Sequence, residues 1–184
     1  MKLNEIRNNL RKLLLEKKNG SYKYGCVMAQ LKINKKEWDS IQELIKDDEL
    51  YTGGKNMGRE DDPHITLLYG LHDTIEDKEI KEVVEGFESF DVELKKVDIF
   101  ENDEFDVVKF SITNKDLNKY NKELKEFPYT SDFPDYKAHA TIAYVKKGLG
   151  KEIMGRYKDF EAISFTCDTI KYSKADKTKK YFKI

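Results

Sequence analysis

His64-Ile65-Thr66-Leu67-Leu68-Tyr69 and His139-Ala140-Thr141-Ile142-Ala143-Tyr144 are two copies of one pattern, His-x-Thr-apolar-apolar-Tyr. In an extended strand, residues two apart lie on the same face, on the order of 7 Å apart along the strand. Each copy therefore places an imidazole and a hydroxyl side by side. Two such strands lying together would form a site from four functional side chains, namely His64, Thr66, His139 and Thr141.

The sequence around both motifs alternates between helical and extended patterns. Apolar residues recur at helical spacing within 38–45, 80–87, 117–124 and 153–157. Strand patterns occupy 24–33, 64–71, 90–100, 106–113, 138–145, 160–172 and 179–184. We therefore predict a chain in which helices and strands alternate throughout.

The order strand, helix, His-x-Thr strand, helix, long strand occurs twice, over 24–100 and over 106–172. Both long strands change the phase of their apolar residues, which predicts a bend or bulge at a comparable place in each. This repetition indicates a diverged duplication. We predict one two-lobed domain over 1–184 with pseudo-twofold lobes, a central cleft and helices on the outside. Its parts are a first lobe at about 22–102, a second lobe at about 105–184 and an N-terminal helix at about 3–18.

Composition restricts the partners of the protein. The 184 residues include 34 basic and 35 acidic residues, so no global field attracts duplex nucleic acid or an anionic membrane surface. The chain also lacks an apolar run near the ~20 residues that a membrane helix requires. We expect a cytoplasmic protein that captures an anionic ligand locally, with neither duplex nucleic acid nor a membrane as partner.

The repeated residues suit acid and base chemistry on a phosphate. A lone histidine in a strand is more often structural, but here two of the three histidines occupy matched positions, each with a threonine two residues later. The imidazole pKa near ~6.5 lets one histidine act as base and the other as acid, and a threonine hydroxyl can donate to a phosphate oxygen. The third histidine, His72, has no counterpart, and we assign it a surface or loop role.

The same residues are a poor metal site, because no carboxylate or third histidine stands at ligand spacing and threonine is a weak ligand. We therefore expect chemistry that needs no metal and no cofactor.

Strict alternation assigns the remaining motif residues to faces of the strands. Tyr69 and Tyr144 fall on the face opposite to the histidines, which predicts that they are structural and buried against helices. Leu68 and Ala143 fall on the same face as the histidines and threonines, which predicts that they shape the floor of the cleft.

Two loops lead into the motifs and supply the candidate substrate-binding residues. The glycine-containing loop 51–59 carries the cations Lys55 and Arg59, and the aromatic loop 128–137 carries Phe133, Tyr136 and Lys137. Aromatic rings beside a phosphate site can stack on nucleobases. Two plainer interpretations stay open: a mobile first loop, and a second loop whose aromatic rings attach it to the core.

The paired His-x-Thr motifs in a duplicated α+β chain resemble the 2H phosphoesterase superfamily over nearly the whole sequence. The segments 62–70 and 137–144 are most similar to those of phage anti-CBASS phosphodiesterases, which degrade the cyclic di- and trinucleotides of bacterial antiphage signalling. The resemblance implies lobes of antiparallel-rich sheet and a catalytic tetrad of His64, Thr66, His139 and Thr141. It also implies cleavage of 3'-5' bonds in cyclic oligonucleotides such as cGAMP, in the cytoplasm of an infected host.

Two other functions use the same four residues. The protein could act on RNA ends, such as 2',3'-cyclic phosphate or 2',5'-linked termini, as RNA-processing members of the superfamily do. It could instead sequester a cyclic nucleotide without cleaving it, with the histidines and threonines as phosphate ligands. The sequence does not distinguish the base, ring size or linkage of the substrate, and it names no protein partner.

Overall fold

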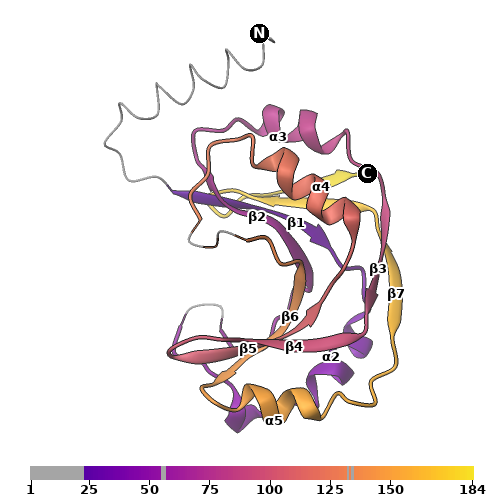
Figure 1. Ribbon diagram of the computed structural model, residues 1–184. Coiled ribbons are helices and arrows are strands. Elements are labelled where there is room, and N and C mark those ends of the chain that lie inside the picture. Colours follow the sequence, from indigo (N-terminus) through magenta and orange to yellow (C-terminus); the bar gives the residue numbers. More distant parts are fainter. Residues whose placement is uncertain (1–22, 55–56, 132, 134) are drawn as a thin grey trace.

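The computed structural model describes residues 23–54, 57–131, 133 and 135–184, and Figure 1 shows their arrangement. The helix expected at about 3–18 lies outside the described residues, as does Lys55. The strands are β1 (Tyr24–Gln30), β2 (His64–His72), β3 (Phe90–Leu94), β4 (Lys96–Glu101), β5 (Phe105–Ser111), β6 (His139–Lys146), β7 (Ile163–Cys167), β8 (Thr169–Ser173) and β9 (Lys179–Lys183). The helices are α2 (Lys35–Gln42), α3 (Asp77–Val84), α4 (Lys115–Leu124) and α5 (Gly150–Gly155), with a 3-10 turn at Asp47–Glu49.

The strands form two antiparallel sheets. Seven strands lie in the order β4-β5-β6-β2-β1-β8-β9, and β3 pairs with β7 in a separate two-stranded sheet. The two His-x-Thr strands, β2 and β6, occupy the third and fourth positions of the large sheet and pair with each other. This arrangement confirms the predicted α+β class and places both motifs in the middle of the molecule.

The two predicted long strands are each divided in two. Lys95 separates β3 from β4, and Asp168 separates β7 from β8, so each long strand leaves the small sheet and enters the large one. The bends expected from the apolar phase are thereby confirmed. The lobes in space nevertheless differ from the halves of the sequence: β4 pairs with β5 of the second half, whereas β8 pairs with β1 of the first. A boundary at residues 102–105 therefore does not separate two structural lobes, because the halves exchange their last strands.

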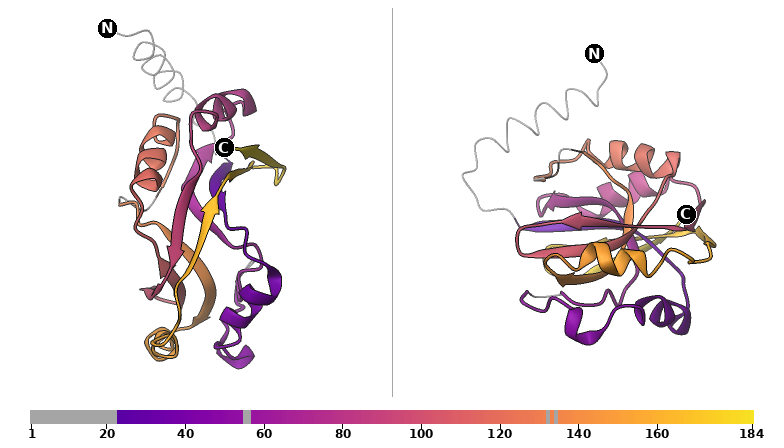
Figure 2. Two further views of the ribbon diagram at one scale, coloured as in Figure 1. Left: turned by 90° about the vertical axis from the view of Figure 1, so that its right-hand side faces the viewer. Right: turned by 60° about the horizontal axis from the view of Figure 1, so that its bottom comes forward.

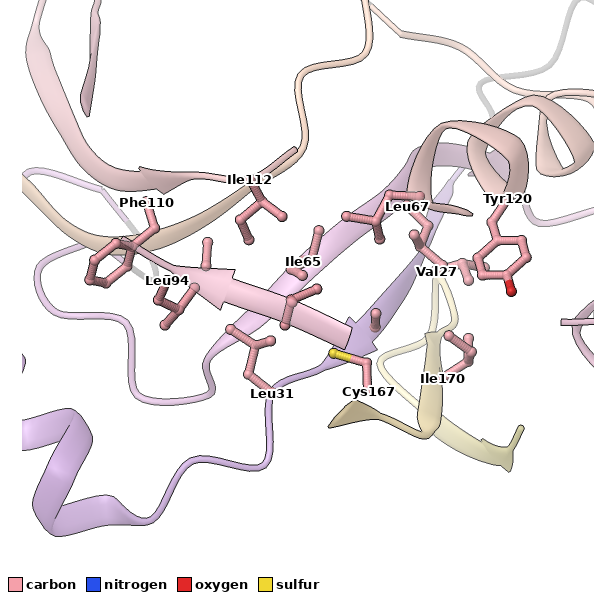
Figure 3. Packing of buried hydrophobic residues seen from close by; sticks show 14 of the residues in the cluster. Val27, Leu31, Ile65, Leu67, Leu94, Phe110, Ile112, Tyr120, Cys167 and Ile170 are labelled. Atoms are coloured by element: carbon pink, nitrogen blue, oxygen red, sulfur yellow. The ribbon is translucent and has the colours of Figure 1, made fainter. Parts of the chain in front are cut away.

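The core lies on one face of the large sheet. Along β3, buried and exposed residues alternate, and the buried Leu94 lies with Cys167 of β7 around Ile65 of β2 (Figure 3). The views in Figure 2 show α3 and α4 at one end of the sheet and α2 and α5 at the other. No helix among the described residues has the length and apolar character to cross a membrane. The small sheet and the helices thus shield one face of the central strands.

Both His-x-Thr strands contain a bulge directly after the threonine. On β2, Thr66 pairs with Met28 and Leu68 with Val27, which leaves Leu67 as the extra residue. On β6 the pairing jumps in the same way over Ile142. A bulge interrupts the hydrogen-bonded ladder and shifts the alternation of side chains beyond it.

Buried side-chain amides bind the carbonyl oxygens of both bulges. Asn121 of α4 donates from Nδ2 to the Leu67 carbonyl at 2.6 Å. Gln42, the last residue of α2, donates from Nε2 to the Ile142 carbonyl at 2.8 Å. Because a buried carbonyl without a partner is unfavourable, these two contacts stabilise the bulges and connect each one to a helix.

The bulge on β2 predicts a specific loss of stability. Asn121→Ala leaves the buried Leu67 carbonyl without its amide donor, and we expect the free energy of unfolding to fall by about 1 to 3 kcal/mol. Urea denaturation followed by circular dichroism measures this change. The control is Asn118→Ala on the exposed side of the same helix, with an expected change within about 0.5 kcal/mol. Equal effects of the two substitutions would contradict the role of Asn121.

Candidate active site

The pairing of β2 with β6 brings the two motifs together. Ile65 pairs with Ala140 in antiparallel register, and both side chains are fully buried. The residues on either side point to the opposite face, so Thr66 lies across from His139 and His64 lies across from Thr141. Cross-strand neighbours of this kind have Cβ atoms about 4.5 to 5.5 Å apart. His64, Thr66, His139 and Thr141, here called the tetrad, thus form a compact group on one face, the tetrad face.

Both imidazole rings are held by the same backbone contact. Nδ1 of His64 lies 2.7 Å from the carbonyl oxygen of Asp62, and Nδ1 of His139 lies 2.7 Å from that of Lys137. A carbonyl oxygen only accepts, so Nδ1 must carry the proton in each ring. Nε2 is therefore the atom of each ring that can exchange a proton with a ligand.

The surroundings of His139 favour its neutral form. Burial lowers the pKa of His139, and the positive charges of Lys109 and His64 lower it further, against the raising effect of the hydrogen bond to Lys137. The ring of Phe100 packs edge-on against the imidazole, with the centroids 4.9 Å apart. Since a neutral imidazole with Nδ1 protonated has its lone pair on Nε2, His139 is suited to accept a proton.

A buried lysine lies beside the second motif. Lys109 of β5 pairs with Thr141 and is only 3% exposed. Its Nζ atom donates to Ser111 Oγ at 2.8 Å, lies 3.4 Å from Asp98 Oδ2 and sits 4.3 Å from the centroid of the Phe100 ring. Burial lowers the pKa of Lys109 despite the opposing charge of Asp98. The Lys109 ammonium group therefore lies next to the tetrad in a buried, low-dielectric environment, where its charge is only weakly screened.

A second buried lysine accompanies the first motif. Lys171 of β8 pairs with Met28, which in turn pairs with Thr66, so Lys171 lies on the tetrad face. Its Nζ atom lies 2.6 Å from Oδ2 of Asp62, the residue whose carbonyl oxygen holds the His64 ring. The contact thus helps to position His64.

Neither of these lysines was among the site residues predicted from the sequence. A recognisable signal was present, since apolar residues flank each lysine within a strand pattern: Val108 and Phe110 beside Lys109, and Ile170 and Tyr172 beside Lys171.

The bulges overturn the predicted orientation of the residues after each threonine. Beyond the extra residue the alternation reverses, so Leu68 and Ala143 are buried in the core instead of forming the floor of a cleft. The same reversal brings the tyrosines to the tetrad face. Tyr69 is 56% exposed, and Tyr144 is half-buried, with the side chain of Thr141 lowering its pKa against the larger, raising effect of burial. The prediction that both tyrosines are buried structural residues is wrong, because strict alternation takes no account of a bulge.

The candidate residues of the aromatic loop have different surroundings. Tyr136 donates its hydroxyl to the Thr66 carbonyl at 3.1 Å, and burial raises its pKa, so it packs directly beside the tetrad. Phe133 is 75% exposed. Lys137 contributes its backbone carbonyl to His139, a contact that depends on the conformation of the main chain.

Arg59 of the first loop is occupied by other contacts. Its guanidinium lies 2.5 Å from Asp47 Oδ1 and 2.5 Å from the Ile45 carbonyl oxygen. These contacts attach the loop to the turn after α2.

His72 is buried, which corrects the surface role expected for it. It ends β2 with 8% of its surface exposed, and its Nε2 atom lies 2.8 Å from Thr130 Oγ1. Burial lowers the pKa of His72. His72 is covered because β2 extends to this residue and the aromatic loop passes over the end of the strand, where the backbone N–H of His72 donates to the Pro128 carbonyl.

Among the described residues, no three His, Cys, Asp or Glu side chains gather in a way that could hold a metal ion. The tetrad face instead carries the hydroxyls of Thr66 and Thr141 and the ammonium groups of Lys109 and Lys171, which interact with anions.

Comparisons with known proteins identify relatives of this fold. The family model described as "2'-5' RNA ligase superfamily" matches residues 33–179. A structure of Kluyveromyces marxianus Usb1 with uridine monophosphate shares 10% identity at a TM-score of 0.59, covering 89% of this chain and 99% of that one. A structure of E. coli LigT complexed with 3'-AMP shares 9% identity at a TM-score of 0.53, covering 89% and 96%. No curated protein matches the sequence.

The electrostatic setting of His139 can be tested by titration. Lys109→Met removes a nearby positive charge and keeps a side chain of similar length, so we expect the pKa of His139 to rise. Because burial is the larger cause, the value should stay below the usual ~6.5. Titration of the imidazole by NMR measures the shift. The exposed Lys146→Met on the same strand serves as the control, and an unchanged His139 pKa in Lys109→Met would disprove the contribution of Lys109.

Proposed function

Because the chain belongs to the 2'-5' RNA ligase superfamily, the 2H phosphoesterases, we propose that it is a phosphodiesterase that needs no metal ion. In this proposal His64 and His139 serve as general acid and general base, and Thr66 and Thr141 bind the phosphate oxygens. The observation that carries the proposal is the crossed arrangement of the tetrad, in which each histidine lies opposite the threonine of the other strand. A phosphate bound between the strands would then meet one imidazole on each side.

The lowered pKa of His139 supports its assignment as the base of the first step. Nε2 of His139 accepts the proton of a ribose 2'-hydroxyl while the 2'-oxygen attacks the adjacent phosphorus. The bond from phosphorus to the 5'-oxygen breaks, and Nε2 of His64 donates its proton to that leaving oxygen. The products are a 2',3'-cyclic phosphate and a 5'-hydroxyl.

A second step can open the cyclic phosphate with the roles exchanged. His64, now neutral, accepts a proton from water while the water oxygen attacks phosphorus. The bond from phosphorus to the 2'-oxygen breaks, and His139 returns its proton to that leaving oxygen. The product is a linear 3'-phosphate. Both histidines recover their starting protonation states, so the cycle needs no other reactant.

The buried lysines support charge stabilisation in this mechanism. Negative charge grows on the phosphate oxygens as the 2'-oxygen attacks, and preorganised donors in a site of low dielectric stabilise such charge strongly. Thr66 and Thr141 supply hydroxyl donors, while Lys109 of β5 and Lys171 of β8 supply positive potential on the same face of the sheet.

For the substrate we propose cyclic di- and trinucleotides. The similarity of segments 62–70 and 137–144 to phage anti-CBASS enzymes supports this choice. The protein would then act in the cytoplasm of an infected cell and linearise the signalling nucleotide.

RNA ends are the second candidate substrate, and the comparisons favour it. The matched family is described as one of 2'-5' RNA ligases, and the two similar structures hold uridine monophosphate and 3'-AMP. The same tetrad chemistry would open a 2',3'-cyclic phosphate or cleave a terminal linkage.

One substrate panel distinguishes these possibilities. The purified protein is incubated in excess EDTA with cyclic dinucleotides, cyclic trinucleotides and an RNA oligomer that ends in a 2',3'-cyclic phosphate. Chromatography identifies the products. Linearised rings support the antiphage function, and products from the RNA alone support RNA processing. If every compound is recovered intact both with and without EDTA, the phosphodiesterase proposal is contradicted and sequestration is favoured.

Loss of either histidine should abolish most of the activity. We expect His64→Ala and His139→Ala each to lower kcat by at least about 100-fold, because each removes one proton-transfer group. Initial rates measure the loss, and circular dichroism shows whether the fold is kept. His72→Gln, which alters the remaining histidine, is the matched control and should keep its activity. Retained activity in both tetrad variants would refute the assignment.

A further inference from the structure

The edge strand β9 presents different residues on its two faces. Its central residue, Tyr181, pairs with Lys171 of β8; Lys171 pairs with Met28 of β1, and Met28 pairs with Thr66. Paired residues lie on the same face of a sheet, so Tyr181 stands on the tetrad face in the same cross-strand row as Thr66. Three strand spacings separate the two residues, a distance on the order of 14 Å.

The residues on either side of Tyr181 follow the same alternation. Lys179 and Lys183 lie on the tetrad face, whereas Lys180 and Phe182 lie on the other. The ion pairs agree with this division. Lys179 contacts Asp62, next to the tetrad, and Lys180 lies 3.7 Å from Asp77 of α3.

Tyr181 is an accessible aromatic ring, with 54% of its surface exposed. An exposed ring on a sheet face gives a nucleobase a platform for stacking, and stacking tolerates any base because every base has a π face. Its position in the Thr66 row means that a nucleotide chain leaving the tetrad across the strands would meet this ring.

Positive charge flanks the ring on one side. Lys179 and Lys171 share the single carboxylate of Asp62, at 3.5 and 2.6 Å from its Oδ2 atom. Two cations share one anion there, which leaves a local excess of one positive charge.

The other side of the ring has the same imbalance. Asp168 contacts both Lys183 and Lys32, the latter at 2.5 Å. These two clusters together hold four lysines against two aspartates, a suitable setting for a backbone of phosphates.

We propose that Lys179, Tyr181 and Lys183, here called the β9 platform, bind the single-stranded RNA that continues beyond the cleaved linkage. This inference rests on the proposed function in its linear-RNA form. A compact cyclic dinucleotide held at the tetrad would not extend to the β9 platform, whereas an oligomer would stack a base on Tyr181 and place phosphates near the two lysines. The β9 platform therefore selects for linear substrates longer than a dinucleotide.

A direct binding measurement tests the β9 platform apart from catalysis. The probe is a fluorescent single strand of about eight nucleotides, with 2'-O-methyl groups that remove the attacking hydroxyl, so the intact protein binds it without cleaving it. Fluorescence anisotropy gives the dissociation constant at several salt concentrations. We expect Tyr181→Ala to weaken binding about tenfold and Tyr181→Phe to retain it.

Charge variants on the same strand supply the matched control. The double substitution Lys179→Gln and Lys183→Gln should reduce the slope of log K against the logarithm of salt concentration by about 1.4 in magnitude. Each lost phosphate contact on a single strand contributes ~0.7 to that slope. Lys180→Gln removes the same charge from the opposite face and should change binding by less than about twofold. Equal losses for the two faces, or no loss for any variant, would overturn the proposal.

Cleavage assays separate failure of the β9 platform from failure of the proposed function. If the wild type cleaves both a dinucleotide and an oligomer, Tyr181→Ala should raise KM for the oligomer alone. An unchanged KM for the oligomer would reject the β9 platform and leave the proposed phosphodiesterase function intact. If the wild type cleaves neither substrate, the proposed phosphodiesterase function fails. The β9 platform would still stand if the variants of the tetrad face lose affinity for the probe and Lys180→Gln does not. Failure of the wild-type protein to bind the probe would overturn the proposal. The alternative partner would then be a protein strand that pairs with the main-chain groups of the edge strand β9.

Discussion

The antiparallel pairing of Ile65 with Ala140 is the constraint on which the site depends. It is the contact through which the two His-x-Thr strands meet in the middle of the large sheet. Side chains alternate along a strand, so a slip of one residue would turn one histidine and one threonine into the core. Burial of Ile65 and Ala140 makes that slip unfavourable, and the hydrophobic core thereby holds four polar residues together on the opposite face.

The paired bulges show how a duplicated strand can serve both the core and the site. Each strand keeps alternating up to its threonine, and one extra residue then reverses the alternation so that a tyrosine returns to the tetrad face. The interrupted ladder leaves one carbonyl oxygen in each strand without a ladder partner. Asn121 and Gln42 donate to these two oxygens from different helices. The helices therefore stabilise the local geometry from which the tetrad and Tyr144 are arranged.

The near symmetry of the two halves does not extend to their charges. Lys109 lies beside Thr141 on the strand next to the motif, whereas Lys171 lies one strand further out and contacts Asp62. The difference lies in the residues at matching positions, since Met28 pairs with Thr66 where Lys109 pairs with Thr141. It places the cation Lys109 close to His139, where its charge adds to the effect of burial and favours a neutral imidazole. A duplicated framework can thus provide two histidines with different proton affinities.

The sequence by itself determined the repeated motifs, the helices and the bends of the long strands. The helices and bends could be predicted because the spacing of apolar residues directly reflects helix and strand geometry. The partners of each strand were decided only in three dimensions. The exchange of β4 and β8, the burial of Lys109 and the alignment of Tyr181 with Thr66 all depend on pairings between distant segments. The bulges also escaped prediction, since their extra residues become evident only against a partner strand. Sequence periodicity describes one strand at a time, whereas register and burial are properties of strands packed together.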